Sequence, residues 1–289
     1  MTQLAGKTIL VTGASSGLGL QVAVELACLG GEVVMTSRDA KKGDAAVAEA
    51  KARSGSNAIS VMLCDFASQA EVRRLAARWR EERPRLDVLV NNAGSVSPVR
   101  RVTADGLEQT FAVNHLGYFL LTNLLLDVIE RSAPSRVVNV ASAAHRMGDL
   151  DFGNLQYERG GYTTMRAYSR SKLANVLFTA ELARRLSGKG VTANCVHPGA
   201  VATNIWTGAP WYARPLVAVA KRFMLSPERG ARPIVRLAAS PELDGRTGGY
   251  FEKDRLVSPS RLAQDEALAK RLWEVSAELV SVSSRRGRP

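Results

Sequence analysis

The sequence lacks the features that mark membrane, secreted and metal-binding proteins. Its 289 residues include three cysteines and three histidines, and neither type is clustered at the spacing of metal ligands. No apolar run reaches the roughly 18 to 20 residues that a membrane span requires, and a strand pattern begins by Thr8, which leaves no room for a signal peptide. We therefore expect no metal site, no integral membrane segment and a cytoplasmic protein, with reduced, buried thiols at Cys28, Cys64 and Cys195.

Acidic residues are also in short supply. There are 27 Asp and Glu against 39 Lys and Arg, which gives a formal net charge of +12. A basic surface attracts nucleic acid, anionic lipid or an anionic cofactor. The basic residues are spread along the chain, and their one dense run, at 285–288, belongs to a basic tail over about 281–289. Because no recognition module is evident, we expect no nucleic-acid partner and keep a basic nucleic-acid binder only as an alternative.

Short β-branched runs alternate with longer amphipathic segments. We expect strands over 7–12, 32–36, 58–63, 86–90, 136–141 and 191–196, with a weaker one over 247–251. Helical patterns cover 17–29, 40–53, 69–83, 105–131 and 167–187. Buried strands that alternate with helices predict an α/β fold: a single-domain, Rossmann-type doubly wound parallel sheet of about seven strands with helices on both faces. No linker divides residues 1–289, and a lid-like insertion is expected over about 200–226.

A glycine-rich turn separates the first strand from the first helix. Residues 12–19 read TGASSGLG. Glycines let the backbone turn sharply and approach a pyrophosphate, and the following helix N-terminus offers N–H groups and a positive dipole end. A plain structural turn is the alternative. The residues expected to hold the dinucleotide here are Gly13, Ser15, Ser16, Gly17, Leu18 and Gly19.

The ends of the second and third strands predict which dinucleotide binds. Ser37 stands where an NAD-binding fold places a carboxylate on the ribose, and the next residue is Arg38, which favours the 2′-phosphate of NADP over NAD. Alternatively, Arg38 pairs with Asp39, which caps the next helix. After the third strand, Asp65 is placed to accept a hydrogen bond from the adenine amine with Phe66 packed nearby, or else Asp65 caps the helix that follows.

Small and polar residues follow the fourth strand and interrupt the next helix. Asn92, Ala93 and Gly94 form a turn in which the nicotinamide ribose can lie close. Further on, Asn114 lies in an apolar helix, where a buried amide needs partners. We expect Asn114 to open the helical ladder and hold a water. Its neighbour His115 is expected to be a packing or surface residue.

The fifth and sixth strands each end in residues that face the ligand edge of such a sheet. Ser142 follows the fifth strand, and His145 lies in the next loop, either lining a substrate pocket or exposed to solvent. After the sixth strand we expect cofactor contacts at Pro198, Gly199, Val201 and Thr203. The apolar insertion beyond them, with Trp206 and Trp211, is interpreted as a substrate lid, or alternatively as a surface that binds a partner.

The last candidate site residues are Tyr168 and Lys172. Residues four apart lie on one face of a helix, so the ammonium of Lys172 is expected beside the phenol of Tyr168. A positive charge there would lower the pKa of the phenol and make it a usable acid/base. Alone, the spacing is weak, and an apolar helix face with a surface lysine is the ordinary interpretation.

In order along the chain, these motifs resemble the short-chain dehydrogenase/reductase family, over about residues 6–280. The runs NHLGYFLLT at 114–122 and SKLANVLF at 171–178 resemble its retinol dehydrogenase-like branch. The separation from Ser142 to Tyr168, which is longer than most members show, is also typical of that branch. The resemblance implies Tyr168 as general acid/base, Lys172 as the residue that lowers its pKa and binds the nicotinamide ribose, Ser142 as a hydrogen bond to the substrate oxygen, and Asn114 as the holder of a relay water.

The resemblance implies an NADP(H)-dependent enzyme that interconverts a carbonyl and an alcohol on a small-to-medium lipophilic substrate. A catalytically weak NADP(H)-binding regulatory module is the alternative. The two apolar helical segments, 105–131 and 167–187, favour a homodimer or homotetramer.

Overall fold

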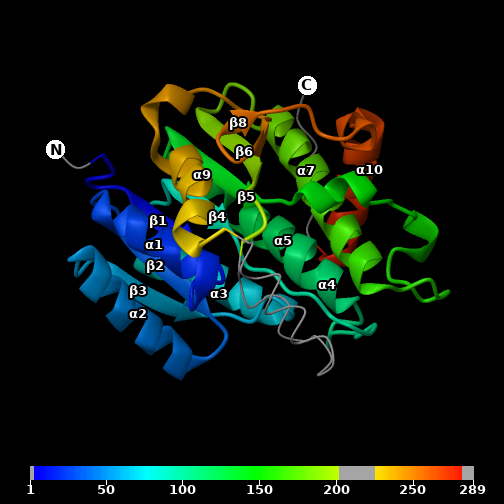
Figure 1. Cartoon of the computed structure of the whole chain (residues 1–289), viewed down its shortest axis with the longest axis horizontal. Helices are drawn as coiled ribbons and strands as arrows, with labels where there is room; N and C mark the ends of the chain where they lie inside the picture. Colours follow the sequence, from blue (N-terminus) through cyan, green and yellow to red (C-terminus); the bar gives the residue numbers. More distant parts are fainter. Residues whose placement is uncertain (1–2, 202–224, 282–289) are drawn as a thin grey trace.

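Eight strands form one sheet in the computed structural model, which describes residues 3–201 and 225–281. Their order is β3-β2-β1-β4-β5-β6-β7-β8. All neighbours pair in parallel except β8, which pairs antiparallel with β7. The order reverses between β1 and β4, so the predicted doubly wound sheet is confirmed, and the short edge strand β8 is an addition to it (Figure 1).

The strands follow the apolar runs closely. They are β1 (Thr8–Val11), β2 (Glu32–Ser37), β3 (Ile59–Leu63), β4 (Val88–Asn91), β5 (Ser135–Val140), β6 (Val191–His197), β7 (Tyr250–Glu252) and β8 (Arg255–Leu256). The main helices are α1 (Gly17–Cys28), α2 (Ala40–Ser54), α3 (Gln69–Glu82), α4 (Gln109–Phe111), α5 (Gly117–Leu124), α6 (Leu126–Arg131), α7 (Thr164–Arg185), α9 (Pro227–Ala239) and α10 (Glu266–Leu279).

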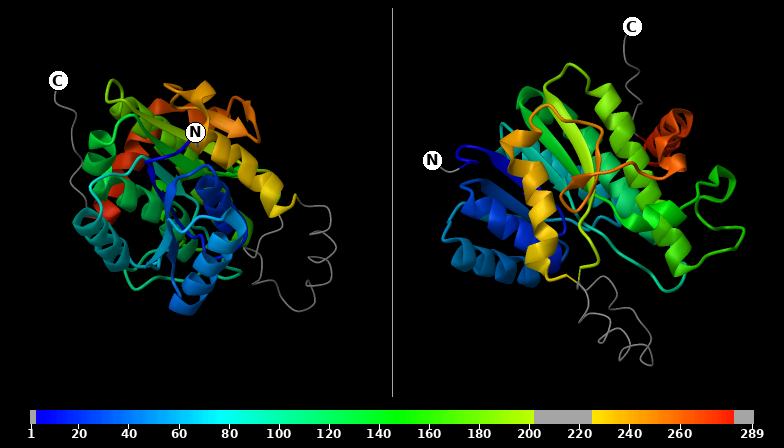
Figure 2. Two further views of the ribbon diagram at one scale, coloured as in Figure 1. Left: turned by 90° about the vertical axis from the view of Figure 1, so that its left-hand side faces the viewer. Right: turned by 45° about the horizontal axis from the view of Figure 1, so that its top comes forward.

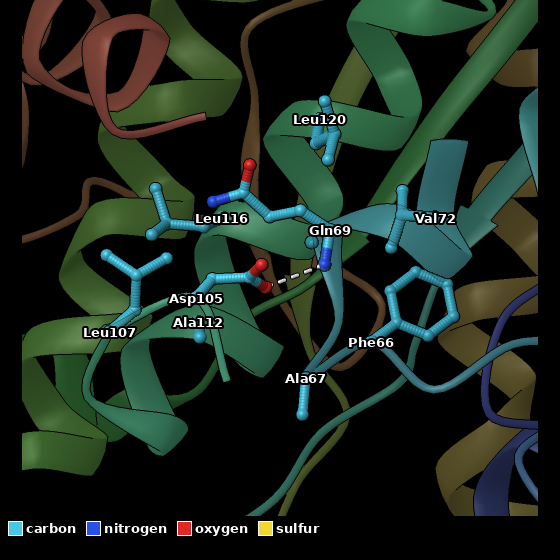
Figure 3. Close-up of a pocket in the computed structure, with 10 residues that line it drawn as sticks. Phe66, Ala67, Gln69, Val72, Asp105, Leu107, Ala112, Leu116 and Leu120 are labelled. Carbon is cyan, nitrogen blue, oxygen red and sulfur yellow. Dashed lines mark hydrogen bonds between the residues drawn. The ribbon is translucent and has the colours of Figure 1, made fainter. Parts of the chain in front are cut away.

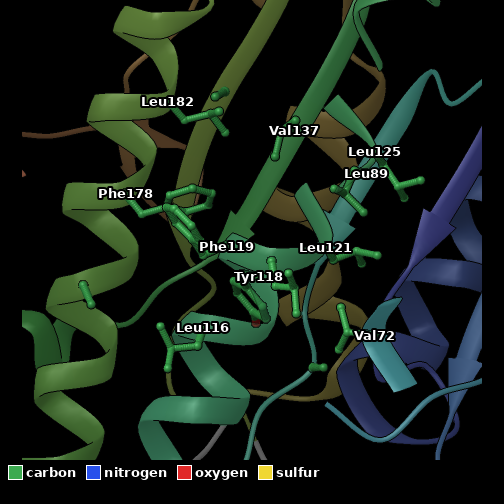
Figure 4. Packing of buried hydrophobic residues seen from close by; sticks show 14 of the residues in the cluster. Val72, Leu89, Leu116, Tyr118, Phe119, Leu121, Leu125, Val137, Phe178 and Leu182 are labelled. Atoms are coloured by element: carbon green, nitrogen blue, oxygen red, sulfur yellow. The ribbon is translucent and has the colours of Figure 1, made fainter. Parts of the chain in front are cut away.

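Helices cover both faces of the sheet and create two hydrophobic cores. One face packs against α1, α2 and α9, and the other against α3, α5 and α7 (Figure 1). Figure 4 shows the second core, in which Phe119 of α5 meets Phe178 of α7 with ring centroids 5.6 Å apart. Between residues 3–201 and 225–281, no helix combines the length and hydropathy needed to cross a bilayer.

The predicted helix over 105–131 is instead a series of shorter pieces. It begins at Gln109, after Glu108 caps α4 by accepting from the N–H groups of Thr110 (2.7 Å) and Phe111 (2.8 Å). A π-helical turn, η1 (Ala112–Leu116), then joins α4 to α5. This turn confirms the expectation that the helical ladder opens around Asn114.

Two helices were not predicted from the sequence. Asp265 caps α10 by accepting from Leu268 N–H at 2.9 Å, whereas α9 contains Pro233, a residue that normally ends a helical pattern. The predicted start of α7 was also wrong by three residues, because Thr163 caps it through Arg166 N–H. Cys64 and Cys195 are buried as expected, but Cys28 is exposed at the end of α1.

Candidate active site

The glycine-rich turn is pressed against the segment that follows β4. Gly13 has φ +63°, and a Cβ there would lie 2.7 Å from the Cα of Ala93. A Cβ on Gly19 would collide with the amide of Asn92. These glycines therefore permit a close approach of two backbone segments at the carboxyl edge of the sheet.

Thr12 ties these two segments together, a role that the sequence analysis missed. Its hydroxyl accepts from the N–H groups of Asn92 (2.8 Å) and Ala93 (3.0 Å). In return, the Asn92 amide donates to Thr12 O at 2.8 Å. The position of Thr12 at the end of β1, directly before Gly13, is the sequence signal that could have identified it.

The N-terminus of α1 is suited to an anion. Ser16 is the N-cap residue, but its side chain makes no capping hydrogen bond, and the first turn contains no acidic residue. The hydroxyl and the first N–H groups of the helix therefore remain available together with the positive end of the helix dipole. Because Gly17 has φ +57° and Ser16 is exposed, a pyrophosphate fits this turn.

Arg38 lies exposed just beyond β2. It makes no hydrogen bond or ion pair with any residue in 3–201 or 225–281, so the alternative in which it pairs with Asp39 is not observed. Asp39 instead caps α2 by accepting from Lys42 N–H at 2.9 Å, as expected. Ser37 is buried and donates its hydroxyl to the carbonyl oxygen of Asp39 at 2.7 Å.

Asp65 and Phe66 lie where β3 ends. Ser68, not Asp65, caps α3, which makes the helix-cap alternative for Asp65 wrong. One carboxylate oxygen of Asp65 accepts from Ala67 N–H at 2.9 Å. Phe66 is buried in the core beside Gly117 and lines a cavity of about 10 Å³ between α3 and α5 (Figure 3). That cavity has room for about one water and is too small for a ligand.

Ser142, Tyr168 and Lys172 come together between the end of β5 and the first turns of α7. The Ser142 hydroxyl is hydrogen-bonded to the phenol of Tyr168. Lys172 is buried, and its ammonium donates to Val140 O at 2.9 Å. It lies 5.7 Å from the ring centroid of Tyr168. The helical spacing thus places the side chains on one face, as predicted.

The pKa values of this group differ from the expectation. Burial raises the pKa of Tyr168, and the hydrogen bond from Ser142 opposes that shift. Burial also lowers the pKa of Lys172 to about 7. The expected lowering of the phenol pKa by Lys172 is therefore wrong for the chain by itself, because desolvation disfavours the charge on both side chains. Tyr168 is consequently held protonated at neutral pH, although its ring is partly exposed.

Asn114 joins the loop after β4 to the catalytic helix. Its amide donates to Ser95 O and to the hydroxyl of Ser171, both at 3.0 Å, and accepts from Ser95 N–H at 2.7 Å. Ser171 in turn donates to the carbonyl oxygen of Tyr168 at 2.7 Å. Both N–H groups of the Asn114 side chain are thus used, while its amide oxygen accepts one hydrogen bond and can accept a second. The relay water expected at Asn114 stays a prediction.

His145 is structural, and both interpretations offered for it from the sequence are corrected. The ring is buried, with Nδ1 2.8 Å from Ser142 O and Nε2 accepting from Ser260 N–H at 3.0 Å. With both ring nitrogens bonded to backbone, His145 is neither an exposed loop residue nor free to bind a substrate. Burial lowers its pKa. It holds the loop that carries Ser142 against the segment before α10. His115, the residue after Asn114, is also buried and packs, as expected, between Phe111 and Phe178.

The exit from β6 also reaches this edge of the sheet. Pro198 is buried, Gly199 has φ +97°, and Val201 pairs with Leu225 in an isolated parallel bridge. Gly230 of α9 admits this approach, because a Cβ there would collide with Val201. Thr203, Trp206, Trp211 and nearly all of the expected lid over about 200–226 lie outside the described residues, as does the basic tail from residue 282.

Comparison with known proteins agrees with this arrangement. The family model for short chain dehydrogenases matches residues 7–210. Human retinol dehydrogenase 13 is 42% identical over 284 residues, which cover 96% of this chain and 86% of that protein. Human retinol dehydrogenase 14 is 43% identical over 295 residues and covers 96% and 87% of the two chains.

Two solved structures also resemble this chain in fold and sequence. An uncharacterized protein from Mycobacterium Paratuberculosis matches with a TM-score of 0.78 at 34% identity, over 96% of this chain and 94% of that one. The RhlG/NADP active-site complex of Pseudomonas aeruginosa matches with a TM-score of 0.68 at 26% identity, over 92% and 97% of the chains. The present chain is therefore an alcohol/carbonyl oxidoreductase that belongs to the short-chain dehydrogenase/reductase family, in its retinol dehydrogenase-like branch.

Proposed function

We propose that this enzyme uses NADP(H) to interconvert a carbonyl and an alcohol on a small-to-medium lipophilic substrate, with Tyr168 as general acid/base. The observation that carries the proposal is the grouping of Ser142, Tyr168 and buried Lys172 at the carboxyl edge of β5. Tyr168 and Ser142 offer two hydroxyls to one substrate oxygen, which is what a developing alkoxide needs.

In the reduction of a carbonyl, Tyr168, Ser142 and Lys172 have different roles. The bound nicotinamide supplies the hydride. Protonated Tyr168 donates its proton to the carbonyl oxygen as that oxygen gains charge, while Ser142 stabilises the same oxygen by a hydrogen bond. The phenolate that remains is stabilised when Lys172 is protonated and is then reprotonated from solvent. Oxidation of the alcohol runs through the same groups in reverse.

The choice of NADP(H) rests on Arg38 and on one relative. Arg38 is exposed next to the end of β2, where a dinucleotide fold presents the ribose, and no carboxylate in the described chain pairs with it. RhlG, which has 26% identity to this chain, was solved as an NADP complex. The residues proposed to hold the cofactor remain those predicted from the sequence.

A lipophilic substrate is supported by apolar side chains left exposed on segments that carry or follow residues of the proposed site. Val99, Met147 and Met165 are 57%, 66% and 44% exposed. They lie on the loop after β4, at the end of the turn after Ser142, and in the first turn of α7. The turn that ends at Met147 follows Ser142, the first turn of α7 precedes Tyr168, and the loop after β4 contains Ser95, the partner of Asn114. The names of the human relatives, retinol dehydrogenases, are consistent with such a substrate.

The replacement Tyr168→Phe tests the mechanism. We expect turnover of every aldehyde or ketone substrate to fall by about 100-fold or more, because the proton donor is lost, with little change in NADPH affinity. Turnover is measured by NADPH absorbance and affinity by NADPH fluorescence. A variant with the wild-type rate would exclude Tyr168 as the acid. A wild-type chain that binds NADPH but reduces no carbonyl in a broad screen would favour the regulatory module instead.

A cytoplasmic location and a homodimeric or homotetrameric state stay predictions. The side of α7 that was expected to form an interface is partly covered by α10 of the same chain. Cell fractionation and light scattering would test the two predictions separately.

A further inference from the structure

A long irregular segment separates Ser142 from Tyr168. After the 3₁₀ turn η2 (Ala143–Met147), residues 148–163 run outward and return to the first turn of α7. In the right-hand view of Figure 2 this loop projects beside α7. The segment contains one short 3₁₀ turn, η3 (Phe152–Asn154), and Tyr157 with φ +56°. Most of the segment therefore lacks the backbone hydrogen bonds of a helix or strand, and other contacts must hold its conformation.

Arg170 holds this segment from α7. The guanidinium is 1% exposed, although it is a charged group. Nε and Nη2 donate to one carboxylate oxygen of Asp149 at 3.1 and 2.9 Å, and Nη1 donates to the carbonyl oxygens of Asn154 (2.8 Å) and Leu155 (3.1 Å). The same group lies 4.1 Å from the ring centroid of Tyr157. One side chain thus binds the start and the middle of the segment at once.

The other side of the segment is bound to the loop that leads to Asn114. Arg100 Nε donates to Gln156 O at 2.8 Å, and the Gln156 amide oxygen accepts from Glu108 N–H at 2.6 Å. Tyr162 donates its hydroxyl to Ser97 O at 2.7 Å. Residues 148–163 therefore join the loop after β4 to α7, the helix that carries Tyr168.

We propose that Arg170 is a positioning residue that keeps residues 148–163 as a fixed wall of the substrate site and so determines which carbonyl compounds reach Tyr168. This inference rests on the proposed function. Arg170 lies between Tyr168 and Lys172 in the sequence but, two residues from each, faces the opposite side of the helix. It contacts the wall and not the reacting atoms.

The first test is a comparison of Arg170→Lys with Arg166→Ala. Lysine keeps the charge but cannot make the forked contacts or the ring stacking. Arg166 is the control because it binds the same segment from the surface, at the other oxygen of Asp149 (3.1 Å) and at Gly161 O (2.9 Å). It is half exposed and lies 6.0 Å from the Tyr157 ring centroid, so solvent screens its contacts and they contribute little. For Arg170→Lys we expect KM for long-chain aldehydes to rise about tenfold, with a smaller change in kcat and in NADPH affinity.

The selectivity ratio distinguishes the proposal from a general loss of stability. We expect the ratio of kcat/KM between long and short aldehydes to change at least fivefold in Arg170→Lys and to stay at the wild-type value in Arg166→Ala. Equal losses on both substrates, with unchanged KM, would overturn the proposal. Should Arg170→Lys not fold, Asp149→Asn weakens the same contacts from the loop side and must shift the ratio in the same direction.

Hydrogen exchange provides a readout that does not depend on turnover. Peptides from residues 148–163 should exchange faster in Arg170→Lys than in the wild type, while peptides from β5 and β6 should not change. Unchanged protection of 148–163 would overturn the positioning role. If the wild type reduces no carbonyl at all, the proposed function fails and the substrate part of this inference fails with it, whereas the exchange data still decide whether Arg170 holds the segment.

Discussion

Lys172 is the residue whose chemistry depends most on packing. On a solvated helix it would be a permanent ammonium, but in this chain it is 3% exposed and bonded to the Val140 carbonyl. Burial brings its pKa down to about 7 from the ordinary value of 10.5. The charge that the catalytic proposal assigns to it is therefore sensitive to pH near neutrality.

The pH dependence of stability follows from this shift. Between pH 7 and 10.5 the unfolded chain binds more protons at Lys172 than the folded chain does, so this residue destabilises the fold most below pH 7 and progressively less above it. Lys172→Met should accordingly raise the free energy of unfolding of the protein without added cofactor at pH 6.5, with a smaller gain at pH 9. Urea titrations at both pH values measure this. A gain that grows with pH would contradict the lowered pKa.

Arg38 decides cofactor preference in the proposed function. Replacing it with alanine should weaken NADPH binding by about tenfold or more and leave NADH binding within about twofold, because a charge-assisted bond to a phosphate contributes on the order of 1.5–3 kcal/mol. Fluorescence titration with both dinucleotides measures the difference. Lys42→Ala, on the first turn of α2, is a control for general loss of positive charge. Equal losses for NADPH and NADH would exclude a 2′-phosphate contact.

At the scale of elements, the core depends on α10, a helix that was not predicted from the sequence. Trp273 is 5% exposed and meets Phe119 and Phe178 at centroid distances of 4.9 and 5.7 Å. The Ser276 hydroxyl also makes a 2.8 Å hydrogen bond with Nε2 of His115, which belongs to the π-helical turn. The C-terminal helix thus supports the same turn that carries Asn114.

Trp273→Ala should lower the free energy of unfolding by about 3–5 kcal/mol, the usual cost of removing a buried aromatic side chain. Glu274→Ala, exposed on the same helix, controls for helix propensity and should change stability by less than about 0.5 kcal/mol. Urea denaturation followed by circular dichroism gives both values. Equal effects of the two substitutions would mean that α10 is not part of the cooperative core.

At the scale of the whole molecule, α10 bears on how copies of the chain associate. It packs on α7 and α5, the helices that the sequence predicted as an interface. A chain ending at residue 264 should therefore associate more strongly than the full chain at equal concentration, because the apolar faces around Phe119 and Phe178 become exposed. Light scattering measures the mass. A truncated chain that associates less would show that α10 itself forms the interface.

What the sequence determined by itself was local and periodic. Apolar runs alternating with helices specified a doubly wound sheet, because buried strands need cover on both faces. Gly13 and Gly19 marked the turn, since only glycine permits that approach to Asn92 and Ala93. The spacing of Tyr168 and Lys172 determined that they share a helix face.

Tertiary structure decided everything that depends on which segments meet. Burial, not the neighbouring charge, determines the pKa directions of Tyr168 and Lys172. His145 became a backbone anchor only because Ser260, far along the chain, reaches its ring. In the sequence Arg170 has no feature that distinguishes it from a surface arginine. In the folded chain it is buried, because the segment 148–163 packs over it. Spacing along the chain determines which side of a helix a side chain faces. Desolvation and long-range partners depend on how the whole chain packs, so no local sequence pattern predicts them.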